Sequence, residues 1–350
     1  YGLVGSEMCI RDREWRSLHL PGETTTQLDD PLDPYVADEP LTPALLNDFL
    51  RHPVRHFFRE RLKVYFESVQ APLADDEPFV LDALQRYSLS QTLLNAALTE
   101  PTQSHEALHG QAHRLQGSGL LPLAGFGECL QEELIEPLPD LLSRHRQLLQ
   151  QWPTCIDSAL PIRFEAGPLK LEGWLGRVQQ RADQALLSIT TVPNSISSGR
   201  TLKWHRLTST WVMHLAACAV GHPLHSAVVA TDVTLMLEPL AQSEASELLG
   251  HLLISRQAGM NAPLPVAIKT AFAWLAQKDP EKALAEAAKT YDGDGQKRAG
   301  ERNEIPALIR QFSDFAAMSA SEEFEGWCEA LYKPMFEANW QTLASEEPRP

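Results

Sequence analysis

Five basic side chains lie close together near residue 50 and have the types and spacing to bind anions. They are Arg51, Arg55, Arg59, Arg61 and Lys63, opposed only by Glu60. Because Arg51, Arg55 and Arg59 recur every four residues, one continuous helix would place them on one face. Such a face can contact the phosphates of a nucleic acid or dock on an acidic protein surface. The same pattern is typical of a solvated helix face opposite apolar residues, so three interpretations stay open.

The spacing of histidines and cysteines can indicate a metal site. His105, His109 and His113 recur at a spacing that places three imidazoles on one side of a helix, where they can bind a metal, but also fit an exposed polar helix. The five cysteines are scattered, odd in number and form no Cys-x-x-Cys pair, so neither a disulfide framework nor a structural zinc site is expected. We therefore predict no metal and no cofactor bound by this chain.

The elements that position these residues follow from the hydrophobic periodicity. Helices are expected on both sides of a central group of strands. Apolar and polar residues alternate near residues 162–164 and 169–175, and a mostly apolar run follows at 185–192. These three runs predict an antiparallel meander. A helix at 207–220 and a buried strand at 226–231 follow.

Helix boundaries are predicted from local signals. Thr42 and Asp279 each precede a proline and are predicted N-caps, and Pro53 predicts a kink. Ser319 and Glu322 are predicted to form a capping box before the last long helix, and Gly259 to end the helix at 241–257.

Composition limits the class of protein. The chain has 350 residues and a formal net charge of −16, which argues against a free-standing DNA-binding module. No apolar run is long enough for a membrane helix and no signal-peptide core is present, so we expect a cytoplasmic protein without membrane contact. Residues 1–13 resemble a translated adapter sequence and are expected to be non-native, with the natural protein beginning upstream. Residues 14–40 are expected to form a linker.

The predicted order is helices, three antiparallel strands, a helix and a further strand, which is the core order of the PD-(D/E)xK nuclease fold. We therefore expect an α/β fold with an inactivated PD-(D/E)xK (restriction-endonuclease-like) core and extra helices. Within a domain spanning residues 41–350, the core is expected at about 120–260 and a helical tail at 261–350.

Four segments carry a family resemblance. They are Phe49–Leu62, Leu121–Glu128, Trp211–Ala219 and Gly259–Pro265. In this order and spacing the chain resembles the C-terminal domain of the RecC family, the gamma chains of exodeoxyribonuclease V, from about residue 41 onward. The resemblance implies a scaffold and strand-separation subunit that does not cut DNA itself. It also implies a heterotrimer with RecB-like and RecD-like subunits, which hold ATP and Mg²⁺, and contact with DNA through the assembled complex.

Three positions of the nuclease-like core lack the residues that active relatives use. In those relatives the second strand reads Gly-x-x-Asp-x-Val and the third ends in Asp-x-Lys. Here Gly176 stands at the aspartate position, and Ser188 and Thr190 stand at the second acid and the lysine. Neutral hydroxyls cannot replace the carboxylates that hold Mg²⁺, so these positions are predicted to be vestigial. The alternatives are an active metal-dependent PD-(D/E)xK exonuclease domain and a free-standing helical adaptor with no DNA role.

Overall fold

The structure is a computed structural model that describes residues 32–37, 39–66, 81–99, 105–122, 124–199, 201–295 and 299–343. The chain divides into two units, Tyr1–Tyr35 and Val36–Pro350, and the description below concerns the second. The predicted non-native segment, residues 1–13, and most of the predicted linker lie outside the described residues.

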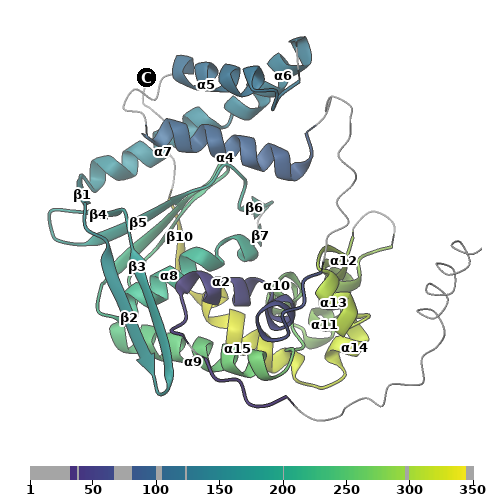
Figure 1. The fold of residues 1–350 in the computed structure, drawn as a ribbon. Coiled ribbons are helices and arrows are strands. Elements are labelled where there is room, and N and C mark those ends of the chain that lie inside the picture. The colour runs from purple at the N-terminus through teal and green to yellow at the C-terminus, as the bar shows by residue number, and fades with distance from the viewer. Residues whose placement is uncertain are drawn as a thin grey trace, which may run out of the picture. The chain divides into compact units, whose positions relative to one another are not determined.

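A six-stranded mixed sheet lies in the middle of the second unit (Figure 1). In spatial order it contains β1 (Thr154–Ile156), β4 (Val178–Gln180), β5 (Leu186–Thr191), β8 (Leu224–Val229), β9 (Thr234–Leu237) and β10 (Trp340–Leu343). Only β5 and β8 run parallel, because α8 (Thr208–Ala219) crosses between them. The predicted α/β class is confirmed.

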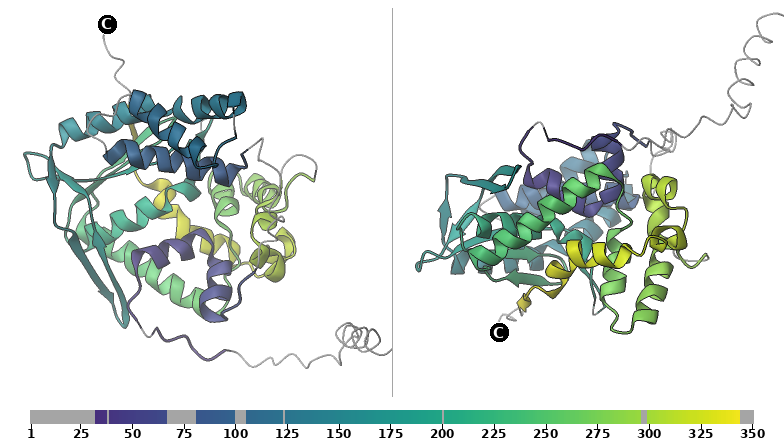
Figure 2. Two further views of the ribbon diagram at one scale, coloured as in Figure 1. Left: turned by 45° about the horizontal axis from the view of Figure 1, so that its top comes forward. Right: turned by 90° about the horizontal axis from the view of Figure 1, so that it is seen from below.

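Alternating residues along the strands face two different helical layers. Leu187, Ala227 and Val229 belong to a hydrophobic cluster with α4 (Ala83–Thr99), α5 (His105–Gly117), α6 (Ala124–Ile135) and α7 (Leu138–Gln151). On the other face, Leu186 and Val228 join the cluster that contains α8, α2 (Pro43–Arg51) and α9 (Gln242–Asn261). Figure 2 shows α2 beside α8 and α9.

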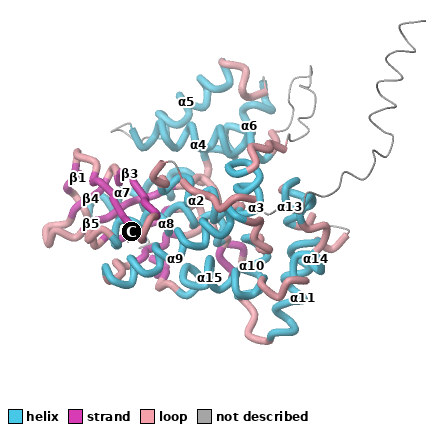
Figure 3. Tube along the Cα trace, turned by 60° about the horizontal axis from the view of Figure 1, so that its bottom comes forward, coloured by secondary structure: helices cyan, strands magenta, loops and turns pink. Residues whose placement is uncertain are grey.

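The helices that follow α9 pack beside it. They are α10 (Ile268–Leu275), α11 (Pro280–Asp292), α12 (Glu301–Glu304), α13 (Pro306–Gln311), α14 (Phe315–Ser319) and α15 (Phe324–Glu337). The helices α10 to α14 lie away from the sheet, as Figure 3 shows, whereas α15 runs along α9 and leads back to β10. Buried aromatic side chains hold this group together; Phe315 meets Phe324 edge to face with ring centroids 5.3 Å apart. No helix among the described residues is long and apolar enough to cross a lipid bilayer.

The predicted three-stranded meander is wrong in its pairing. β2 (Leu160–Ala166) and β3 (Leu169–Leu175) form a separate two-stranded sheet, and it is β4 that pairs with β5. The chain changes direction between β3 and β4 at Gly176 and Arg177, where Arg177 has a φ of 51°. A left-handed residue interrupts regular strand geometry, so the predicted strand at 169–175 ends as β3 and a further strand that was not predicted, β4, pairs with β5.

Two of the predicted caps are confirmed. The Thr42 hydroxyl accepts from the Leu45 amide at 3.2 Å, and the Asp279 carboxylate accepts from the Glu281 amide at 3.1 Å. The capping box is wrong, because α15 begins at Phe324 and the Ser319 hydroxyl donates to the Phe315 carbonyl of the preceding helix.

Gly259 does not end α9, which continues to Asn261. A Cβ atom at this glycine would lie 2.6 Å from a ring carbon of Phe49. Gly259 therefore allows close packing of α9 against α2 rather than a helix end.

Candidate functional site

Gly176 precedes β4, and β4 pairs with the strand that carries Ser188 and Thr190. Ser188 and Thr190 are two residues apart in β5 and therefore face the same side, the side of α8. Val178, the first residue of β4, lies opposite Ser188 in the antiparallel ladder. Because the two strands run in opposite directions, the residues before Val178 lie on the side of Ser188 toward Thr190. A Cβ atom at Gly176 would meet nothing within 4 Å, so this position has room for a side chain.

The side chains of Ser188, Thr190 and the neighbouring Ser226 are neutral hydroxyl groups. Ser226 is the partner of Ser188 in β8 and shares a 3.0 Å hydrogen bond between its hydroxyl and Nδ1 of His214. Burial lowers the pKa of His214 to about 4, so this imidazole is neutral at pH 7. Burial raises the pKa of the neighbouring Cys218 thiol. We name Gly176, Ser188, Thr190 and Ser226 the sheet corner; its side chains carry no charge that would attract a divalent cation.

The described residues contain no group of three or more His, Cys, Asp or Glu side chains that could hold a metal ion. In α5, His105, Glu106 and His109 have the His-Glu-x-x-His spacing of zinc metalloproteases. The spacing supplies two imidazoles, and a zinc site needs a third protein ligand beside them. The sequence motif alone therefore does not define a zinc site.

The basic segment around residue 55 is not one continuous helix. α2 ends at Arg51, and His52 has non-helical dihedral angles, φ −151° and ψ 70°. The chain then forms the short helix α3 (Pro53–His56) and the π-helical turn η1 (Phe57–Arg61). The kink predicted at Pro53 is confirmed, and the regular four-residue spacing no longer gives the arginines one common helical face.

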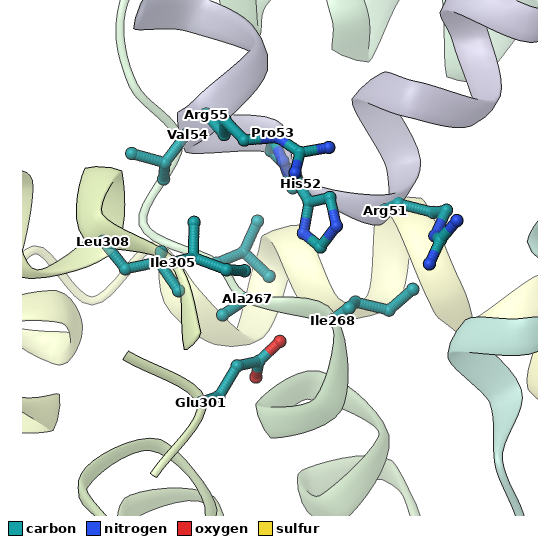
Figure 4. Close-up of a pocket in the computed structure, with 11 residues that line it drawn as sticks. Arg51, His52, Pro53, Val54, Arg55, Ala267, Ile268, Glu301, Ile305 and Leu308 are labelled. Atoms are coloured by element: carbon teal, nitrogen blue, oxygen red, sulfur yellow. The ribbon is translucent and has the colours of Figure 1, made fainter. Parts of the chain in front are cut away.

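Carboxylates neutralise most of this segment locally. Arg55 bonds Asp48 at 3.0 Å, Arg59 bonds Glu60 at 3.3 Å, and Lys63 lies 3.8 Å from Glu60. Arg61 is half-buried. Arg51 is exposed and forms no ion pair with any described residue, and it lies on the other side of His52 from Arg55 (Figure 4).

A buried charge network behind this segment joins α2 and α3 to α9. His56 is fully buried, with Nδ1 3.2 Å from a carboxylate oxygen of Asp48, and its Nε2 accepts from Nε of Arg256 at 3.3 Å. Because Nε2 accepts, the ring proton is on Nδ1 and is donated to Asp48. This hydrogen bond and the Arg55 guanidinium lower the pKa of Asp48 to about 2, against the effect of burial. We call Asp48, His56 and Arg256 the helix junction.

Sequence reasoning did not identify the helix junction. Asp48 and His56 are two helical turns apart, a spacing that gives a weak signal for contact. Arg256 lies 200 residues further along the chain than His56, and no local pattern predicts that contact.

Figure 4 shows the small pocket between α3 and the C-terminal helices. The space open to the centre of a water molecule is about 10 Å³, which is room for one water at most. Glu301 lies at its base and accepts from the Lys269 and Thr270 amides at 3.0 and 2.8 Å and from the Thr270 hydroxyl at 2.9 Å. Glu301 thus caps the N-terminus of α10 from another helix, and the pocket is part of the packing rather than a ligand site.

A family model described as the RecC C-terminal domain matches residues 38–279. The chain belongs to this family. The match runs from the start of α2 to the end of α10 and includes the sheet corner and the helix junction. The chain is 30% identical over 308 residues to the RecBCD enzyme subunit RecC of Escherichia coli (strain K12), covering 84% of this chain and 25% of that protein.

A second relative, the RecBCD enzyme subunit RecC of Haemophilus influenzae (strain ATCC 51907 / DSM 11121 / KW20 / Rd), is 29% identical over 120 residues, which cover 34% of this chain and 10% of that protein. The chain thus spans about a quarter of the length of its E. coli relative.

Proposed function

We propose that this chain is a non-catalytic part of a RecBCD-type helicase–nuclease that acts in double-strand-break repair by homologous recombination. The observation that carries the proposal is the RecC C-terminal domain match over residues 38–279. In this role the chain is a scaffold for RecB-like and RecD-like subunits and helps to guide the separated DNA strands. ATP and Mg²⁺ are then bound by those partner subunits.

The second part of the proposal is that residues 41–350 contain a PD-(D/E)xK core that has lost its metal-binding residues. In support, β4 and β5 are antiparallel, and β5 connects through α8 to the parallel strand β8, which is the expected order of the last core elements. Under this proposal, Gly176, Ser188 and Thr190 stand at the positions where the active fold has its carboxylates and lysine. Hydroxyl groups and a glycine cannot neutralise Mg²⁺ or support an attacking water.

A magnesium-dependent cleavage assay on the purified chain tests the loss of catalysis. We expect no cleavage by the chain. The matched variant Gly176→Asp, Ser188→Asp, Thr190→Lys should bind Mg²⁺ more tightly in calorimetry, yet remain without cleavage because the groups that orient such ligands are also needed. Cleavage by the unchanged chain that stops when the metal is chelated would overturn the proposal and establish an active exonuclease domain.

Co-purification tests the assembly. The chain, expressed with RecB-like and RecD-like subunits, should elute with them as one complex. A chain that remains separate from both subunits at low ionic strength would instead be a free-standing helical adaptor.

A further inference from the structure

Four cations from three distant parts of the chain surround the start of α8. They are Arg51 at the end of α2, Lys203 just before the helical turn η2 (Trp204–Arg206), Arg206 at the end of that turn, and Lys269 at the start of α10. The turn is fixed against α10, because the rings of Trp204 and Phe272 stack with centroids 5.6 Å apart. We call these four residues the cation cluster.

Arg51 lines one small pocket together with Ile268, the residue before Lys269, so Arg51 lies close to the start of α10 (Figure 4). The half-buried side chain of His205 lies near all four cations. Its pKa is lowered to about 4, first by burial and then by Lys269, Arg206, Arg51 and Lys203 in that order. All four cations therefore act on one imidazole, which stays neutral at pH 7.

Two of the cations are held in place by one residue. Nζ of Lys203 donates to the Ser195 hydroxyl at 2.6 Å, and Nη1 of Arg206 donates to the Ser195 carbonyl at 2.6 Å. The segment around Ser195 is itself fixed, because the Asp232 carboxylate accepts from the Ile196 and Ser197 amides at 2.9 and 2.8 Å. The charges are thus positioned before any ligand arrives, which reduces the entropy lost on binding.

Counter-charges are scarce at this cluster. Lys269 pairs with Glu304, whereas Arg51, Lys203 and Arg206 form no ion pair within the described ranges. In a chain with a net charge of −16, three converging cations without carboxylate partners are a concentrated positive potential. The basic segment around residue 55 differs, since Arg55, Arg59 and Lys63 have carboxylates within ion-pair distance.

The position of the cluster also favours an anion. The segment that carries Lys203 and Arg206 follows β5 and is tied to Asp232, which follows β8, so it lies at the carboxyl ends of the parallel strand pair. Loops at this end of parallel strands commonly bind ligands. The twelve-residue helix α8 begins two residues after Arg206 without a side-chain cap, and the positive end of its dipole adds to the field.

We propose that the cation cluster binds the phosphate groups of a single nucleic-acid strand. The inference rests on the proposed role in handling separated DNA strands and identifies the residues that contact one of them. Arginine and lysine heads held at fixed positions recognise the phosphate backbone without reading the base sequence.

The test is fluorescence anisotropy of a labelled single-stranded oligonucleotide with the whole chain, repeated over a range of salt concentrations. The test variant is Arg51→Gln, Lys203→Gln, Arg206→Gln. A matched control, Arg86→Gln, Lys170→Gln, Lys333→Gln, removes the same charge from exposed cations that are paired with carboxylates elsewhere. The test variant should bind on the order of 10–100-fold more weakly near 0.1 M salt, and its salt slope should fall by about 2, or ~0.7 per phosphate contact.

Arg51→Gln alone guards against a folding defect, because the Arg51 side chain has no hydrogen bond or ion pair to a described residue. It should lower the salt slope by about 0.7 with unchanged circular dichroism. No binding by the unchanged chain at low salt, an equal loss in the matched control, or an unchanged slope in Arg51→Gln would overturn the inference.

Competitors separate the sources of negative charge. Unlabelled oligonucleotide should displace the labelled strand far better than inorganic phosphate or polyglutamate at equal charge concentration. Equal displacement by phosphate would indicate a free-phosphate site, and equal displacement by polyglutamate an acidic-protein site, and either result overturns the inference. Co-purification with RecB-like and RecD-like subunits is a separate measurement, so a chain that assembles normally but fails to bind the strand contradicts this inference alone.

Discussion

The sheet corner and the helix junction differ in charge. At the sheet corner, Ser188 and Thr190 are neutral and half-buried, and Ser226 shares a hydrogen bond with the neutral His214. At the helix junction, a carboxylate, an imidazole and a guanidinium are linked by consecutive hydrogen bonds. Burying a charge costs free energy unless a partner compensates it. Asp48, His56 and Arg256 meet this condition and join elements that are far apart in sequence. The sheet corner holds no such set of charges. Buried charged side chains in this domain therefore link elements that are distant in sequence. We expect substitutions of these side chains to lower the free energy of unfolding strongly, and substitutions at the sheet corner to change it little.

The largest effect is expected at Glu301, a fully buried carboxyl group that connects α12 to α10 and whose pKa is raised by burial. Glu301→Ala leaves two amides and one hydroxyl near the start of α10 without their acceptor, at a cost of about 4 kcal/mol of unfolding free energy. Chemical denaturation measures the change. Glu304→Ala in the same helix is the control, and its exposed ion pair with Lys269 should contribute less than ~1 kcal/mol. Equal losses in the two variants would show that α10 does not depend on the buried cap.

The second-largest loss of stability is expected for substitution of Arg144. This buried α7 side chain donates to the Ala230 and Thr231 carbonyls at 2.7 and 3.1 Å and to the Thr234 hydroxyl at 2.9 Å, so it joins the helical layer to the β8–β9 turn. Arg144→Met should cost about 3 kcal/mol, because the carbonyls lose charged donors. Arg146→Met, an exposed change on the same helix, should stay within ~0.5 kcal/mol. A thermal unfolding comparison in which Arg146→Met is the more damaging change would contradict this assignment.

Asp48→Asn should give an intermediate effect that depends on pH. The folded-state pKa of Asp48, about 2, lies below its ordinary value of 3.8, so the ionised carboxylate stabilises the fold above pH 3.8. The difference corresponds to about 2 kcal/mol at pH 7.

This stabilisation is lost as the pH falls from about 4 to about 2, and the gap between Asp48→Asn and the unchanged chain should close over that interval. Denaturation curves at several pH values measure the gap. Glu247→Gln, an exposed change in α9, should show no gap at any pH. A constant difference across the pH range would mean that the carboxylate charge is not what Asp48 contributes.

The smallest effects are expected at the sheet corner. Gly176→Ala places a methyl group in open space, and the Ser188 side chain makes no hydrogen bond to a described residue, so each change should stay within ~0.5 kcal/mol. Ser226→Ala is the internal comparison and should cost about 1 kcal/mol, since it removes the partner of buried His214. If Ser188→Ala destabilises more than Ser226→Ala, the corner has a structural role that its geometry does not reveal.

Local chemistry explains which parts of the fold the sequence predicts. Thr42 and Asp279 cap helices through neighbours two or three residues away, and both were predictable. Ser319 has the same local signal, but its hydroxyl bonds back to Phe315, so a capping-box pattern alone does not decide between two adjacent helices. A glycine at position 259 is typical of a helix end, but here the close approach of Phe49 from another helix explains why the residue is a glycine.

The candidate sites divide in the same way. The register of β4 with β5 places Gly176 just before the strand that pairs with the one carrying Ser188 and Thr190, and these residues are only 12 to 14 positions apart. In contrast, the helix junction and the cation cluster each combine segments separated by about 60 to 200 residues. Periodicity describes one element at a time, so it carries no information on which distant side chains will meet.

The edge strand β10 has a consequence for how this domain reaches its native state. Trp340 pairs with Leu237, so β10 joins the sheet from about a hundred residues downstream of β9. Contacts of such long sequence separation close large loops and form slowly. Until they form, β9 presents a row of unpaired amides and carbonyls, which is a template for pairing with another chain. We therefore expect newly made molecules of this protein to be most prone to aggregate after β8 has paired with β9 and before β10 pairs with β9.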